Sequence, residues 1–226
     1  MVALVFGGLI LLLLLFGPQL WTKAVLSKHA KDRSDCPGTG GELAEHLVAQ
    51  YGLQGVAVER LDNDGDHYDP DARAIRLSPR VFDGRSVTAV TVAAHEFGHA
   101  LQHHQNHAGL LRRGKMVSQS MWFDRIGGFI LMTTPVLVFL PGLRWLGVVA
   151  LITGIGMSLI RVAVHLVTLP VEVDASFNKA LPILESNGYL PAEEMPAARS
   201  ILRACAGTYL AASLWSLLNL VRWIRR

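Results

Sequence analysis

The chain has 226 residues, of which 51% are hydrophobic and only 17% are charged, and its formal net charge is +3. Soluble domains carry about 25% charged residues, so this composition predicts one modest domain combined with membrane helices. The basic residues flank apolar runs and are not interleaved with aromatic residues, which favours a lipid bilayer as partner and argues against nucleic acid. The two cysteines, Cys36 and Cys205, lie far apart in the chain, so a zinc ribbon is excluded.

The first 21 residues (1–21) are predicted to form a transmembrane helix. Val2–Leu20 is almost wholly apolar, and its length suits a bilayer span of about 20 residues. A cleaved signal peptide would need basic residues before the apolar run and a small-residue cleavage site after it. The first basic residue, Lys23, instead follows the run, so we expect this helix to be retained.

Residues 22–125 are expected to form a small α+β domain. Glu42–Tyr51 has apolar residues on one side, which predicts a short amphipathic helix. Val56–Leu61 and Ala72–Ser78 alternate between apolar and polar residues and predict two strands, with the polar turn Asp62–Pro70 between them. We therefore expect a β-hairpin or an edge-strand unit directly before the metal helix, and an extended peptide could add to the edge of the strand at Ala72–Ser78.

The sequence His-Glu-Phe-Gly-His lies within Val87–His104, which is predicted to be one buried helix because Ala89–Ala94 is small and apolar. The four-residue spacing places His95 and His99 on one helix face about 6 Å apart, so both imidazoles can bind one metal ion. Glu96 beside them can take a proton from a metal-bound water, which is the zincin arrangement with Zn²⁺ as cofactor. The plain alternative is a core helix with two hydrogen-bonded histidines.

A transmembrane hairpin is predicted over residues 126–169. Its two apolar runs are Ile126–Leu140 and Leu143–Leu169, and the pair Pro141-Gly142 between them favours a tight turn. The hairpin makes helices 2 and 3 of the predicted membrane part.

A helical segment is predicted over residues 170–203, with Pro170 in the first turn of a new helix. Residues 204–226 are apolar again and predict a fourth span that ends in arginines. The expected fold is therefore mainly α and integral to the membrane. It combines about four transmembrane helices with a small zincin-like α+β catalytic domain, made of the His-Glu-Phe-Gly-His helix and a short β-hairpin or sheet.

A catalytic zinc site usually has three protein ligands and an open fourth position. One route to a third ligand is an extended motif with a Gly and a His at fixed offsets, but Gln102 and Gln105 stand at those positions. The other route is a carboxylate from a later helix, for which Glu172 and Asp174 are the candidates. A two-helix membrane hairpin returns the chain to the side from which it left, so these carboxylates and the two histidines can meet.

Five segments, in order over nearly the whole chain, carry a resemblance to a known family. They are Asp66–Pro70, Leu77-Ser78, Ala93–Gln102, Thr168–Ser176 and Thr208-Tyr209. Together they resemble the YugP-type neutral zinc metallopeptidases of bacterial membranes. The resemblance implies a zincin-like peptidase core carried on transmembrane helices in a bacterial plasma membrane. It also implies Zn²⁺ as cofactor and protein or peptide substrates, membrane proteins among them.

The resemblance also bears on the third ligand. Other membrane gluzincins place a ligand Glu at the head of an Ala-containing helical motif, and by similarity Glu172 is favoured. Those proteins usually follow the Ala with an Asp, whereas Ser176 stands there in this chain. Asp174 is therefore the alternative, either as ligand or as the partner that orients a ligand histidine.

The predicted function is a membrane-embedded, zinc-dependent metalloendopeptidase with Glu96 as general base and His95, His99 and Glu172 as metal ligands. The alternative is a non-catalytic membrane scaffold with a structural zinc site. The presence of Glu96 favours catalysis, because a structural site does not use a general base. A metal transporter is disfavoured, because the two histidines lie outside the predicted spans.

The positive-inside rule predicts that the active site faces the cytoplasm. Arg144 in the short hairpin turn is outnumbered by basic residues that flank spans on the other side. These are Lys23, Lys28, Lys31, Arg33, Arg112, Arg113, Lys115 and Arg125, while Arg222, Arg225 and Arg226 oppose this orientation if the last segment spans.

Overall fold

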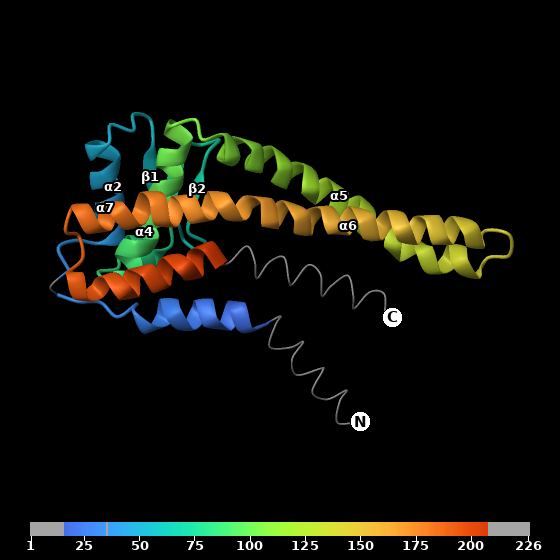
Figure 1. Cartoon of the computed structure of the whole chain (residues 1–226), viewed down its shortest axis with the longest axis horizontal. Coiled ribbons are helices and arrows are strands. Elements are labelled where there is room, and N and C mark those ends of the chain that lie inside the picture. The colour runs from blue at the N-terminus through green and yellow to red at the C-terminus, as the bar shows by residue number, and fades with distance from the viewer. Residues whose placement is uncertain (1–15, 35, 208–226) are drawn as a thin grey trace, which may run out of the picture. The chain divides into compact units, whose positions relative to one another are not determined.

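The computed structural model describes residues 16–34 and 36–207, and the fold is mainly helical with one small sheet (Figure 1). Two compact units are present. The sheet unit comprises Pro18–Leu111 and Pro170–Thr208, and the hairpin unit contains Arg112–Leu169. Residues 16–28 and 195–207 are helical, and the remainder of the predicted first and fourth spans lies outside the described residues.

Three short strands form the sheet, in the order β1-β3-β2. Strand β1 (Ala57–Arg60) runs parallel to β3 (Ala74–Leu77), whereas β2 (His67–Asp69) is antiparallel to β3. The predicted hairpin between the first and last of these strands is therefore wrong. The segment expected to be only a turn contains β2, which pairs with β3 on the side away from β1. Because β3 is central, the prediction that it offers a sheet edge is also wrong; β1 and β2 are the edges.

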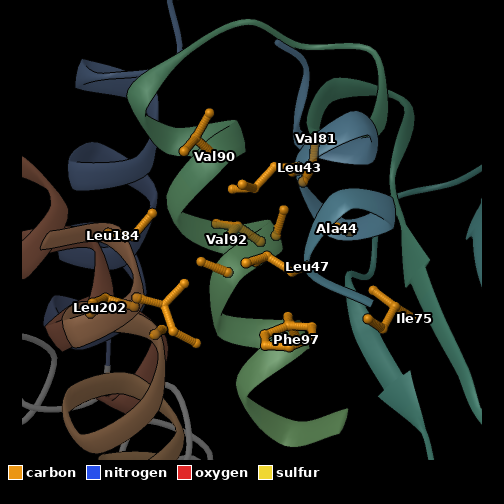
Figure 2. Close-up of a cluster of buried hydrophobic side chains, with 14 of the residues drawn as sticks. Leu43, Ala44, Leu47, Ile75, Val81, Val90, Val92, Phe97, Leu184 and Leu202 are labelled. Carbon is orange, nitrogen blue, oxygen red and sulfur yellow. The ribbon is translucent and has the colours of Figure 1, made fainter. Parts of the chain in front are cut away.

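Helix α4 (Val87–His104) forms the centre of the sheet unit and confirms the predicted helix, including its burial. It begins at the cap residue Ser86, whose hydroxyl oxygen accepts a hydrogen bond from the backbone N–H of Ala89. Residues 87–102 are all buried. Figure 2 shows apolar side chains of α2 on one side of α4 and Leu184 and Leu202 on the other. The histidine-bearing helix is therefore held firmly inside the core.

Two helices before α4 complete this part of the unit. Helix α2 (Gly40–Gln50) is preceded by Thr39, which forms a capping box with Glu42. Helix α3 (Pro79–Phe82) is a single turn between β3 and α4. The predicted amphipathic helix is thus confirmed, because its apolar residues Leu43 and Leu47 are buried against the core.

The chain after the hairpin is helical but differs from the prediction. Helix α6 (Arg144–Val173) passes through Pro170, so no new helix begins there. A proline inside a helix removes one N–H donor and crowds the carbonyl four residues earlier, yet the helix continues past Pro170 to Val173. A π-helix, η1 (Asp174–Ala180), follows directly, and then α7 (Leu181–Ser186) and the short η2 (Ala192–Glu194).

The hairpin unit consists of the packed portions of α5 (Ala108–Phe139) and α6, joined by a turn at Gly142 (φ 80°) (Figure 1). Glycines allow the helices to approach closely, since a Cβ at Gly154 would lie 2.6 Å from Leu131 Cγ. Of the helices in the described residues, α5 alone has the length and composition to cross a bilayer, with a mean hydropathy of 1.3. The apolar stretch Arg144–Met157 is shorter. The four spans therefore stay a prediction.

Candidate metal centre

Three buried side chains from two elements of the sheet unit converge on one point. Helix α4 supplies His95 and His99, and the last turn of α6 supplies Glu172. Glu172 Oε2 lies 3.4 Å from His95 Nε2 and 3.3 Å from His99 Nε2. The three ligand atoms lie within 4.8 Å of one another, and Glu172 is only 1% exposed. Two imidazole nitrogens and one carboxylate are a donor set that suits zinc.

Gly98 allows α4 and η1 to approach closely enough for these side chains to meet. A Cβ at this position would lie 2.7 Å from the backbone oxygen of Ala175 and 3.3 Å from its carbonyl carbon. No rotamer change can relieve a contact with backbone. The glycine of the His-Glu-Phe-Gly-His sequence is therefore required by packing, and the π-helix that it contacts begins two residues after Glu172.

The orientation of His95 is set by Ser176 of η1. The Ser176 hydroxyl lies 3.1 Å from His95 Nδ1 and also donates to the backbone oxygen of Leu202 at 3.4 Å. Because its hydrogen points to Leu202, the Ser176 oxygen accepts from Nδ1–H of His95. That tautomer leaves Nε2 unprotonated on the side of Glu172, as a metal ligand requires. Ser176 therefore orients His95, and the resemblance had left open which residue does so.

His99 is oriented by Gln102, which the sequence reasoning used only to reject the extended motif. Gln102 Oε1 lies 3.0 Å from His99 Nδ1. Its amide nitrogen donates to the backbone oxygen of Val171 at 2.9 Å and to Asp174 Oδ2 at 2.8 Å. These two bonds fix the amide so that its oxygen faces the imidazole. A polar residue three positions after His99, on the same face of the helix, was the signal that could have identified it.

Asp174 lies outside the group of three ligand atoms. It accepts hydrogen bonds from Gln102 and from Asn178 Nδ2, the latter at 2.8 Å. Burial raises the pKa of its carboxyl, but these two hydrogen bonds and the charges of Lys179 and His107 hold that pKa below its usual value. Asp174 therefore supports His99 indirectly, through Gln102, whereas Glu172 lies within 3.4 Å of both imidazoles.

Glu96 lies beside the convergence point, at the free edge of the sheet. The backbone N–H of Tyr68 in β2 donates to its carboxylate. Burial raises the pKa of Glu96 to about 7, His95 and the Tyr68 N–H oppose this rise, and the carboxylates of Glu172 and Asp66 add to it. Edge strand β2 and the Glu96 carboxylate are thus in direct contact, although the sequence reasoning did not predict β2.

Comparisons with known proteins agree with this geometry. A family model described as "Putative neutral zinc metallopeptidase" matches residues 4–226. The chain is 38% identical over 212 residues to "Putative membrane protease YugP" of Bacillus subtilis (strain 168), a match that covers 92% of this chain and 89% of the relative. Comparison with solved structures gave no match. The relative's name and the apolar helix α5 both support membrane association. Because the family match extends over nearly its whole length, the chain belongs to this family of neutral zinc metallopeptidases.

Proposed function

We propose that the chain is an integral-membrane metalloendopeptidase of gluzincin type, with zinc held by His95, His99 and Glu172. The observation that carries this proposal is the convergence of three buried ligand atoms within 4.8 Å. The outer nitrogen of each imidazole is hydrogen-bonded, so both rings are held with Nε2 towards the ion. When bound, zinc acts as a Lewis acid that acidifies a water molecule and polarises a carbonyl.

The protein's own part in hydrolysis falls to Glu96. Its carboxylate is adjacent to His95 and accepts the N–H of Tyr68, which holds it at the edge of the sheet. From there it accepts a proton from the attacking water and passes it to the amine that leaves the cleaved peptide bond. Burial of the side chain, which is 7% exposed, removes competing water from this carboxylate.

The peptide substrate adds to the edge of β2. The N–H of Tyr68 points away from the central strand β3, because it reaches Glu96. The backbone carbonyl of Tyr68 points the same way and can accept an N–H of a peptide laid along this edge in extended form, whose bonds then pass close to Glu96. This places the expected sheet-edge binding on β2 instead of the strand at 72–78.

A structural zinc site in a non-catalytic scaffold is the competing function. Structural sites are usually closed by four protein ligands, whereas catalytic sites have three and an open position. In residues 16–34 and 36–207 the ligand group found around this point has three members, His95, His99 and Glu172. Glu96 next to them has no role in a structural site, so the arrangement favours hydrolysis.

The membrane arrangement proposed with this function has four spans. They are residues 1–21, the two arms of the hairpin at 126–169, and residues 204–226. The exposed apolar side chains of α5 and α6, such as Phe129 and Ile152, suit contact with lipid. By the positive-inside rule the sheet unit faces the cytoplasm of a bacterial cell. Substrates are proteins or peptides, including membrane proteins, and nucleic acid is not a partner.

The test is cleavage by purified, zinc-loaded protein and by its Glu96→Gln variant. Glutamine has nearly the same shape but cannot accept the proton, so zinc content should match the wild type while cleavage of a peptide library is lost. Glu185→Gln, at an exposed site paired with Arg199, is the matched control and should retain cleavage. Retained cleavage in Glu96→Gln would remove Glu96 as the base. An inactive wild type with bound zinc would favour the scaffold.

A further inference from the structure

A cavity of the sheet unit lies on the same face of α4 as Glu96, further towards the end of the helix. Its volume is about 190 Å³, well below the about 300–1,000 Å³ of pockets for drug-sized ligands, so it suits one side chain or chain terminus. It is lined mainly by polar groups, which include the amides of Gln54 and Asn106, two imidazoles and one guanidinium. The described residues that line it include no carboxylate.

Tyr68 connects this cavity to the candidate metal centre. Its backbone N–H donates to Glu96, and its side chain lines the cavity, where the hydroxyl lies 2.8 Å from His103 Nδ1. On α4, Ala100 lies one turn after Glu96 and His104 lies two turns after it, and both line the cavity. The cavity therefore lies one to two helical turns beyond Glu96, where Val56 and Arg73 at the starts of β1 and β3 face the end of α4.

Arg73 supplies a charge that the fold does not use. Among the described residues no carboxylate pairs with its guanidinium, whereas Arg60 pairs with Asp83 and Arg76 pairs with Glu59. Arg73 also has a φ of 51°, in the left-handed region that favours glycine and is strained for arginine. A strained backbone with an unused charged side chain over a cavity indicates a function for that side chain.

The lining chemistry selects an anion. A cation site would need carboxylates, and an apolar side chain would need an apolar wall, which Val56 and Ala100 alone do not provide. Arg73 can form paired hydrogen bonds with a carboxylate. His103 and His104 contribute two imidazoles from the last turn of α4, each of which can donate an N–H. Tyr68, Gln54 and Asn106 add neutral donors.

We propose that this cavity binds a carboxylate of the peptide substrate, with Arg73 as its principal partner; this rests on the proposed function. The carboxylate belongs to an acidic side chain or to the C-terminus of the peptide. The cavity reaches His104, about 12 Å along α4 from Glu96, a length that about three to four residues of extended peptide cover. The bound group thus lies about three residues from the bond that is cleaved, and it determines which peptides are cut.

The test compares matched peptides cleaved by the zinc-loaded full chain. One pair has Glu or Gln at the third position on either side of the scissile bond, and the other has a free or an amidated C-terminus. We expect about a tenfold higher kcat/KM for the acidic member of one pair, and the pair that responds identifies the source of the carboxylate. Arg73→Gly should bring this ratio close to one, and Arg73→Lys should restore most of it.

Folding and function are separated by the choice of variant. Glycine relieves the positive φ at position 73, so Arg73→Gly should be at least as stable as the wild type. Arg80→Gln, at an exposed arginine on α3, is the control and should keep the wild-type ratio. Binding of the same peptides to the Glu96→Gln protein, followed by fluorescence anisotropy, gives a second readout that needs no cleavage.

The outcomes keep the two proposals apart. Cleavage without any preference for the acidic peptides, or with a preference that Arg73→Gly retains, overturns the carboxylate cavity and leaves the peptidase standing. A wild type that cuts no peptide contradicts the peptidase. In that case the anisotropy measurement still decides on the cavity. About tenfold tighter binding of an acidic peptide that is lost with Arg73→Gly supports it, and equal binding rejects it.

Discussion

Replacement of Gly98 by alanine tests how closely α4 and η1 must approach. The added Cβ would lie 2.7 Å from the Ala175 backbone oxygen, and ordinary contact begins at 3.4 Å, so the two backbones must separate by about 0.7 Å. Overpacking of this kind costs about 1–3 kcal/mol, of which higher helix propensity offsets up to about 1 kcal/mol. Metal sites tolerate deviations of only about 0.2 Å. We therefore expect Gly98→Ala to bind zinc at least about tenfold more weakly.

The assay is zinc competition against a fluorescent chelator, combined with thermal unfolding with and without zinc. Zinc should raise the unfolding temperature of the wild type strongly and that of Gly98→Ala much less, because binding to the folded state stabilises it. Gly114→Ala is the matched control, since among the described residues no atom lies within 4 Å of a Cβ placed there. Wild-type zinc affinity and stability in Gly98→Ala would refute the requirement for a close approach at this glycine.

Four further substitutions separate the roles of the polar residues. Glu172→Gln should lower zinc affinity by more than about a hundredfold and Asp174→Asn by about tenfold or less, as measured by chelator competition; the reverse order would make Asp174 the ligand. Gln102→Leu should lower zinc affinity about 10–100-fold because His99 loses its orienting partner, and an unchanged affinity would contradict that role. Asp69 accepts hydrogen bonds from the backbone N–H groups of Ala72 and Asp71 and from Arg76, and the bond from Ala72 contributes most to holding the pKa of its carboxyl below 3.8. Asp69→Asn should therefore cost about 1 kcal/mol at pH 7. Because the pKa is depressed in the folded state, this difference should be full above pH 3.8 and shrink as the pH falls through the folded-state pKa. The measurement is urea unfolding of both proteins across this pH range. A stability difference that does not change with pH would contradict this role of Asp69.

The helix that carries the two histidines could be predicted in detail because its signal is local. Spacing along one helix fixes the relation of His95 to His99, and the small apolar residues before them imply burial. The predicted amphipathic helix near residue 42 and the turn at Pro141-Gly142 rest on equally local patterns, and the structure confirms both.

The sheet could not be predicted in the same way. Strand β2 has three residues, of which only Tyr68 is buried, so it shows no alternation that a sequence pattern could detect. The direction of pairing is set by how the strands pack on α4, and the residue pattern of each strand does not encode it. The prediction at Pro170 failed for a related reason, because a proline near the end of a helix resembles one at a helix start.

The partners of the ligand histidines depend on contacts between segments distant in the sequence. Ser176 meets His95 across 81 positions, and Gln102 meets Asp174 across 72. Sequence spacing alone cannot show that a π-helix after Glu172 places the Ser176 hydroxyl against an imidazole. The resemblance to membrane gluzincins left open which residue orients a ligand histidine. In the structure the Ser176 hydroxyl contacts His95, and the Gln102 amide contacts His99.

The most direct measurement is an anomalous difference map, recorded at the zinc absorption edge, from a crystal of the zinc-loaded full chain. We expect one strong peak bounded by His95 Nε2, His99 Nε2 and the Glu172 carboxylate, next to Glu96. A peak at other residues, or zinc-loaded crystals in which Glu172 points away from both histidines, would contradict it.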